Sequence, residues 1–149
     1  MNNFTICSLK GSEFLHPYSC DLADFEAVKK MMEWVEKRFE SLQILINNAG
    51  IMIYGPLLEQ KPQEWTKMMD VNLISVSYVT QLASKIMGKG GDIIFINSMA
   101  GHVENDNPMT ALYNAGKFAL TGLIENWRRE LKEKSIRYVK FNQFRAQLF

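Results

Sequence analysis

The stretch LQILINNAG, residues 42–50, holds the sequence pattern that decides the fold. Leu42–Asn47 is a brief apolar run without regular polar alternation, which is typical of a strand buried on both faces of a parallel sheet. The run stops at Asn48-Ala49-Gly50, where small residues and a glycine allow the backbone to approach a flat ligand closely. We therefore expect a buried strand over Leu42–Asn47 that ends in a ligand-facing loop.

Amphipathic segments flank this strand on both sides. Residues 24–39 place apolar side chains three and four positions apart, which predicts one helix with Asp24 as its N-cap. A second helix is expected from Pro62, a residue suited to a first helical turn, to about Met87. The cluster Gly88–Gly91 ends it.

The same alternation continues towards the C-terminus. Asp92–Asn97 (DIIFIN) is a second buried-type strand, a third helix is expected from about Thr110 to Lys134, and Ile136–Phe141 (IRYVKF) is a further strand. Strands that alternate with helices predict an α/β fold with a doubly wound parallel sheet and helices on both faces. Ligands of such sheets bind at the carboxyl ends of the strands.

Length and composition agree with one globular domain over residues 1–149. The chain is 47% hydrophobic and 22% charged, and its net charge of +1 gives no electrostatic reason to expect nucleic acid as a partner. No apolar run reaches the roughly 18 residues of a membrane span, and no signal peptide is recognised, so a cytoplasmic location is expected. Cys7 and Cys20 are too few for a disulfide framework, and no metal site is expected.

Two features near the strand ends could carry chemistry. Tyr113 and Lys117 are four residues apart on a predicted helix, so an ammonium lies one turn from a phenol. At about 6 Å and an effective dielectric of ~20, this favours the phenolate by ~3 kcal/mol, although an ordinary helix surface would show the same spacing. Ser98 directly follows the strand Asp92–Asn97, where its hydroxyl could bond a substrate oxygen or simply begin a turn.

Asn72 is the third such feature, because it is the only polar residue on the buried stripe of its helix. An unpaired buried amide would cost about 1–3 kcal/mol, so its partners are either structural or functional. The sequence alone leaves both interpretations open.

Together these residues resemble the short-chain dehydrogenase/reductase family. Asn47-Asn48-Ala49-Gly50, Asp70-Val71-Asn72, Ile96-Asn97-Ser98 and Tyr113-x-x-x-Lys117 occur in the family's order and at similar intervals. Residues 96–102 further resemble the farnesol-dehydrogenase-like branch common among arthropod reductases. The resemblance extends over roughly Tyr18 to Tyr138 and implies a Rossmann-type, three-layer αβα sheet and an NAD(P)-dependent oxidoreductase.

The resemblance implies a role for each motif residue. Tyr113 would be the catalytic acid and base, Lys117 would assist it and bind the nicotinamide ribose, and Ser98 would orient the substrate oxygen. Asn72 would hold a proton-relay water. The cofactor would be lined by Asn48, Ala49 and Gly50, with Asp21 and Leu22 beside its adenine.

The resemblance also suggests the ligands and partners. NADP is favoured over NAD, and the substrate would be an alcohol or carbonyl compound, small or isoprenoid. Copies of the chain would associate through the helices that contain Asn72 and Tyr113.

The chain departs from the family pattern at both ends. The family's glycine-rich turn, which cradles the pyrophosphate, is not found, and Phe14–Cys20 corresponds to a third strand. We therefore expect an incomplete domain in which Phe14–Cys20 has no neighbour and Leu42–Asn47 forms a bare apolar edge. A non-catalytic remnant that associates with full-length relatives is the alternative. A methyltransferase would leave Ser98, Tyr113 and Lys117 unexplained.

Overall fold

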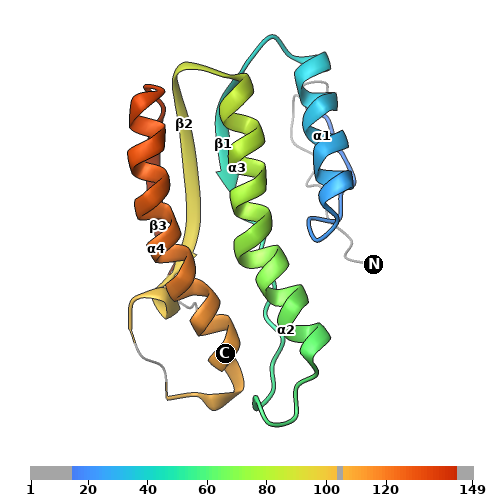
Figure 1. The fold of residues 1–149 in the computed structure, drawn as a ribbon, viewed down its shortest axis with the longest axis vertical. Helices are drawn as coiled ribbons and strands as arrows, with labels where there is room; N and C mark the ends of the chain where they lie inside the picture. The colour runs from blue at the N-terminus through green and yellow to red at the C-terminus, as the bar shows by residue number, and fades with distance from the viewer. Residues whose placement is uncertain (1–14, 104–105, 144–149) are drawn as a thin grey trace.

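The computed structural model of the protein describes residues 15–103 and 106–143, which form an α/β unit with a parallel sheet (Figure 1). Its elements follow one another as α1 (Phe25–Arg38), β1 (Leu42–Asn47), α2 (Pro62–Met69), the π-helix η2 (Asp70–Ile74), α3 (Ser75–Ile86), β2 (Met87–Ser98), the 3-10 turns η3 (Met99–Gly101) and η4 (Pro108–Thr110), α4 (Ala111–Glu133) and β3 (Arg137–Gln143). The predicted alternation of strands and helices is thus confirmed.

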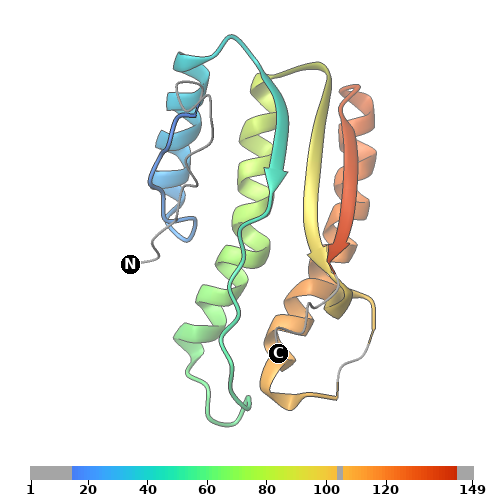
Figure 2. The same ribbon diagram turned by 180° about the vertical axis from the view of Figure 1, so that it is seen from behind.

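The three strands are parallel and lie in the order β1-β2-β3. Leu45 of β1 pairs with Ile93 of β2, which pairs in turn with Tyr138 of β3. Seen from behind, the strands stand in front of α3 and α4, and all three point towards the end of the molecule where η3 and η4 lie (Figure 2). This arrangement brings the residues after each strand to the same end of the sheet, its carboxyl end.

Local signals fix the start of α1. The Asp24 carboxylate accepts hydrogen bonds from the backbone N–H groups of Glu26 and Ala27, at 3.0 and 3.1 Å. Two otherwise unpaired donors of the first turn are thereby satisfied, which confirms Asp24 as the predicted N-cap. Val28 and Met32 then face Val79 and Ala83 of α3.

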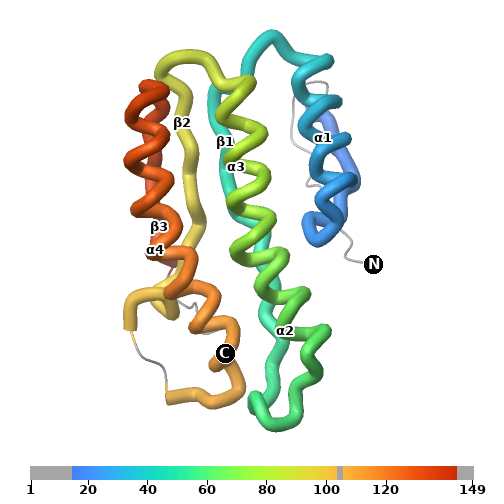
Figure 3. The backbone as a smooth tube through the Cα atoms, viewed as in Figure 1, coloured from blue at the N-terminus to red at the C-terminus, as the bar shows by residue number. Residues whose placement is uncertain are grey.

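The second predicted helix contains an irregularity. Between α2 and α3 the backbone forms the π-helix η2, in which the N–H of Ser75 bonds the carbonyl of Asp70, five residues earlier. Traced as a tube, α2, η2 and α3 continue as one rod (Figure 3). π-Helical turns are rare and often occur at functional sites, and this one contains Asn72.

Strand β2 begins earlier than predicted, at Met87 instead of Asp92. Leu42 pairs with Met87 and Ile44 pairs with Asp92, so the glycine-rich residues between them form an irregularity inside the ladder. Gly90 has φ +81°, a conformation that side chains rarely adopt. The glycines therefore follow the end of the helix, as expected, but belong to the strand.

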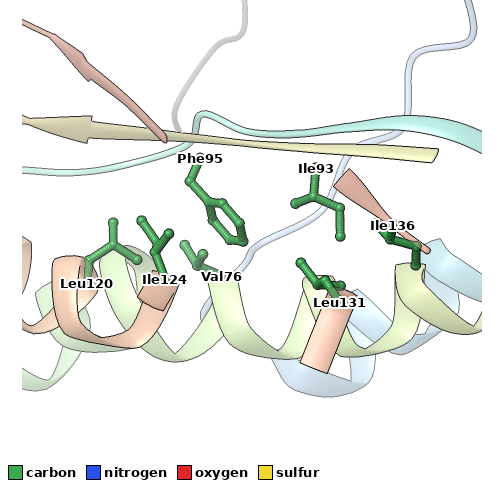
Figure 4. Close-up of a cluster of buried hydrophobic side chains, with 7 residues drawn as sticks. All are labelled: Val76, Ile93, Phe95, Leu120, Ile124, Leu131 and Ile136. Atoms are coloured by element: carbon green, nitrogen blue, oxygen red, sulfur yellow. The ribbon is translucent and has the colours of Figure 1, made fainter. Parts of the chain in front are cut away.

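The core lies between the sheet and the helices α3 and α4 (Figure 4). Ile93 and Phe95 point from β2 towards the helices and are 0% exposed. Burying a side chain of this size contributes roughly 1.5–3 kcal/mol. The residues of this cluster are Val76, Ile93, Phe95, Leu120, Ile124, Leu131 and Ile136.

The other face of the sheet carries no helix within the described part of the chain (Figures 1 and 2). Ile46 and Phe141 are each 57% exposed there, and Ile44 and Val139 are also exposed. The expectation that Leu42–Asn47 is buried on both faces is therefore wrong, because the described helices cover only one face of this strand.

The predicted strand Phe14–Cys20 is not observed. Phe14 lies outside the described residues, and residues 15–20 form neither a helix nor a strand. In the described sheet β1 is an edge strand, as expected, and residues 15–20 do not pair with it. A strand without a ladder partner leaves its backbone groups to water.

Candidate active site

Ser98 is the last residue of β2 and caps the turn η3. Its Oγ accepts a hydrogen bond from the N–H of Ala100 at 3.1 Å, and the side chain is half-buried. The serine begins a turn, as one interpretation expected. It also lies at the carboxyl end of a strand, where the bond from its hydroxyl to a substrate oxygen stays a prediction.

Tyr113 and Lys117 lie on successive turns at the start of α4. The Lys117 Nζ is 5.7 Å from the centroid of the Tyr113 ring, so the two groups are neighbours as the spacing predicts. The same Nζ donates to the carbonyl of Ile96, two residues before Ser98, at 3.4 Å. Lys117 is 6% exposed, and its burial lowers the pKa of the ammonium from its ordinary value.

Asn72 is 2% exposed and makes two hydrogen bonds to the loop that follows β1. Its Oδ1 accepts from the N–H of Ile51 at 2.8 Å, and its Nδ2 donates to the carbonyl of Ile51 at 2.7 Å. The buried amide therefore has structural partners, and it fixes the loop that contains Gly50. A Cβ on Gly50 would lie 3.3 Å from the same Oδ1.

A small pocket lies beside the free edge of β1, at the carboxyl end of the sheet. It brings together Leu22, Asn48 and Ala49 from the predicted set. Gly50 is not part of its lining, and neither is Asp21, whose exposed carboxylate accepts from the N–H of Ala23 at 3.0 Å. The lining consists of Leu22, Met31, Leu45, Ile46, Asn47, Asn48, Ala49, Ser75, Val76 and Val79.

A larger pocket lies at the opposite end of the sheet, between the ends of α1 and α3 and the start of β1. It contains none of the predicted site residues, among them Ser98 and Tyr113. The larger pocket is thus remote from the carboxyl ends of the strands, where ligands of parallel sheets bind.

Sequence reasoning placed Asn47 and Asn97 in two of the motifs but did not identify Thr80 and Thr121, which bind them. Asn47 donates to Thr80 at 3.0 Å, and Asn97 donates to Thr121 at 2.8 Å. Asn47 and Asn97 each end an apolar strand run, which is the sequence signal for a polar contact there, but it does not indicate the partner. Their partners are 33 and 24 residues away in the chain, which no local pattern indicates.

Neither a metal site nor a membrane span is found among the described residues. In residues 15–103 and 106–143, no group of three His, Cys, Asp or Glu side chains could hold a metal ion. Within the same ranges no helix has the length and apolarity needed to cross a membrane.

The sequence was also compared with known proteins. Residues 6–142 match the family model described as short chain dehydrogenase. Over 123 residues the chain is 38% identical to dehydrogenase/reductase SDR family member 11 of Gallus gallus, covering 80% of this chain and 48% of the relative. Over 127 residues it is 35% identical to farnesol dehydrogenase of Aedes aegypti, covering 83% of this chain and 52% of the relative.

Solved structures show the same likeness. A dehydrogenase/reductase from Sinorhizobium meliloti matches with a TM-score of 0.80 and 30% identity, over 86% of this chain and 50% of that one. A short chain dehydrogenase from Burkholderia cenocepacia in complex with NADP matches with a TM-score of 0.74 and 32% identity, over 78% and 47%. The chain thus spans about half the length of these relatives.

Proposed function

The chain belongs to the short-chain dehydrogenase/reductase family, and on this premise we propose that it carries the site of an NAD(P)-dependent oxidoreductase. The reaction is the interconversion of an alcohol and its carbonyl compound. One observation carries the proposal: the buried Lys117 Nζ bonds the β2 strand close to Ser98 while lying one helical turn from Tyr113. A serine, a phenol and an ammonium are thereby associated with the carboxyl end of the sheet.

Each side chain has a distinct part in the proposed reaction. The Tyr113 hydroxyl gives a proton to the carbonyl oxygen in reduction and takes it back in oxidation. The Lys117 ammonium stabilises the phenolate that this transfer leaves behind. Ser98 accepts one hydrogen bond from Ala100, and its own O–H proton donates to the substrate oxygen. Asn72 holds the loop after β1 in place through Ile51.

The residues after β1 fit a nicotinamide dinucleotide. Leu22, Ile46 and Ala49 give the pocket apolar walls suited to a flat ring, and Asn47 and Asn48 are the amide residues of its lining. Asn48, Ala49 and Gly50 would line the cofactor, with Leu22 and Asp21 on the adenine side. The cofactor supplies the hydride when bound. NADP is favoured because similar structures were solved with NADP or NADPH.

The test is turnover with farnesol and a panel of small alcohols, followed by the appearance of NADPH. Tyr113→Phe keeps the ring but removes the transferable proton, so turnover should fall by roughly 10²- to 10⁴-fold. Tyr78→Phe removes a hydroxyl from a half-buried tyrosine of α3, next to Phe25, and should leave turnover unchanged. Equal turnover of wild type and Tyr113→Phe would contradict the proposal.

A second candidate function is association with relatives of the same family without catalysis. The apolar face of the sheet and the edge strand β1 favour it, since exposed Ile44 and Ile46 mark a surface on which another chain could pack. Ile44→Lys should then abolish co-purification with a full-length relative while the fold persists. NADPH binding separates the two candidates, because association alone does not need it.

Copies of this chain would associate through a different surface, formed by the helices that contain Asn72 and Tyr113. Ile74 on η2 and Phe118 on α4 are large, apolar and exposed there. Phe118→Asp should shift the protein towards a monomer in sedimentation velocity. An unchanged sedimentation profile would contradict this interface.

A further inference from the structure

Thr121 of α4 has no part in the proposed reaction, but its hydroxyl contacts groups close to the candidate site. Its Oγ1 lies 3.0 Å from the carbonyl oxygen of Gly101 and 3.1 Å from that of Lys117. It also accepts a hydrogen bond from Nδ2 of Asn97 at 2.8 Å. One hydroxyl therefore lies within hydrogen-bonding distance of groups from β2, from the turn η3 and from α4.

These three parts carry the proposed catalytic side chains. Asn97 immediately precedes Ser98 on β2, and Gly101 closes the turn that Ser98 caps. Lys117 lies one turn before Thr121 on the same face of α4, and Tyr113 lies two turns before it. Thr121 thus links the strand end and the turn on one side to the helix face on the other.

The proton of the Thr121 hydroxyl is best assigned to Gly101. A hydroxyl donates one hydrogen bond at a time, and the Lys117 carbonyl lies within α4, where the helix already provides an N–H donor four residues later. Gly101 is buried, and a buried carbonyl needs a donor. The Thr121 hydroxyl supplies it.

Close backbone contact leaves this junction little freedom. A Cβ on Gly101 would lie 2.4 Å from the carbonyl oxygen of Lys117 and 3.0 Å from Oγ1 of Thr121. The turn therefore lies directly against the helix backbone, with no side chain between them. Its position along α4 is then set by the directional bond from Thr121.

We propose that Thr121 is a positioning residue, whose hydroxyl fixes the turn that begins at Ser98 against the face of α4 that carries Tyr113 and Lys117. This inference rests on the proposed oxidoreductase function. It assigns to a single hydroxyl the alignment between the group that orients the substrate oxygen and the group that transfers the proton.

The first test is amide hydrogen exchange of His102 and Val103, whose N–H groups both bond the carbonyl of Met99 in this turn. Thr121→Val keeps the shape but removes the hydroxyl, and exchange there should become about tenfold faster, as for the loss of one net hydrogen bond. Thr121→Ser should restore exchange to within about twofold of wild type. Unchanged exchange in Thr121→Val, or equally fast exchange in Thr121→Ser, would overturn the proposal.

A matched control separates positioning from general loosening of a helix. Thr66 of α2 also bonds the carbonyl four residues before it, Pro62, at 3.1 Å, but it is exposed and this bond stays within α2. Thr66→Val should leave the exchange of His102 and Val103 unchanged. Acceleration by this variant as well would show that the effect is not specific to Thr121.

Turnover provides the second readout. Thr121→Val should lower kcat about tenfold with little change in KM for NADP, and Thr121→Ser should recover kcat; an unchanged kcat would overturn the positioning role. Hydrogen exchange does not depend on catalysis. Suppose that exchange is faster in Thr121→Val but turnover is unchanged in Tyr113→Phe. The proposed oxidoreductase site would then be contradicted, whereas the structural link through Thr121 would remain.

Discussion

The two faces of the sheet are built from the same strands and the same kinds of residue, yet they have opposite environments. On the face towards α3 and α4, Ile93 and Phe95 are fully buried, whereas Ile46 and Phe141 on the other face are more than half exposed. Alternate residues of a strand point to opposite faces, so Ile93 and Phe95 are buried while Ile94 between them is only half-buried. Burial in this sheet therefore depends on which face the helices cover.

The covered face also holds the polar network of the candidate site. Asn47, Asn97 and Lys117 reach partners on this side, and Asn72 binds the loop that follows β1. Low exposure strengthens these hydrogen bonds and makes each unpaired group costly. Helix packing and site geometry are therefore properties of the same face, and the open face contributes mainly Ile46 to the pocket.

The greatest loss of stability is expected when a phenylalanine of the covered face is replaced, and a phenylalanine of the open face is its control. Phe95→Ala leaves a cavity between β2 and the helices, and it should lower the free energy of unfolding by about 3–5 kcal/mol. Phe141→Ala on the open face should lower it by less than about 1 kcal/mol. Urea denaturation measures both free energies of unfolding. Similar losses for the two variants would contradict the difference in burial between the two faces.

An intermediate effect is expected from the buried amide. Asn72→Leu leaves the N–H and carbonyl of Ile51 without their partners and should lower the free energy of unfolding by about 1–3 kcal/mol. Asn126 on the exposed side of α4, which donates to the Gly122 carbonyl, is the matched control, and Asn126→Leu should change stability by less than about 0.5 kcal/mol. Equal changes would mean that burial does not decide the strength of these bonds.

The smallest effect is a pH dependence that arises from Lys117. Burial lowers the pKa of its ammonium in the folded protein, so the unfolded chain binds more protons between that lowered value and the ordinary value of about 10.4. The stability of wild type relative to Lys117→Met should therefore rise with pH across this window and stay level below it. Denaturation midpoints over alkaline pH measure the difference, and parallel curves for the two proteins would contradict it.

Sequence patterns predicted the local structure well, because the signals for it are local. The strand Leu42–Asn47 has the bounds that its apolar run indicated, and Asp24 caps α1 because its carboxylate is one residue from the helix. The spacing of Tyr113 and Lys117 predicted their proximity, since helix geometry determines it.

Features that depend on distant partners were not predictable. The π-helix around Asn72 has no pattern in the sequence that distinguishes it from an α-helix. The exposure of one face of the sheet arises because the described helices pack only on the other face. The Thr121 junction joins residues 20 and 24 positions apart. Such contacts are products of the packed fold.

We propose that the carboxyl end of this sheet binds a nicotinamide dinucleotide beside Tyr113. A titration of the protein with NADPH, followed by the fluorescence of the nicotinamide, tests this directly. We expect saturable binding below millimolar concentration that is lost in Ala49→Trp, because the indole would fill the pocket after β1. The absence of binding below millimolar NADPH, or binding that Ala49→Trp leaves unchanged, would contradict it.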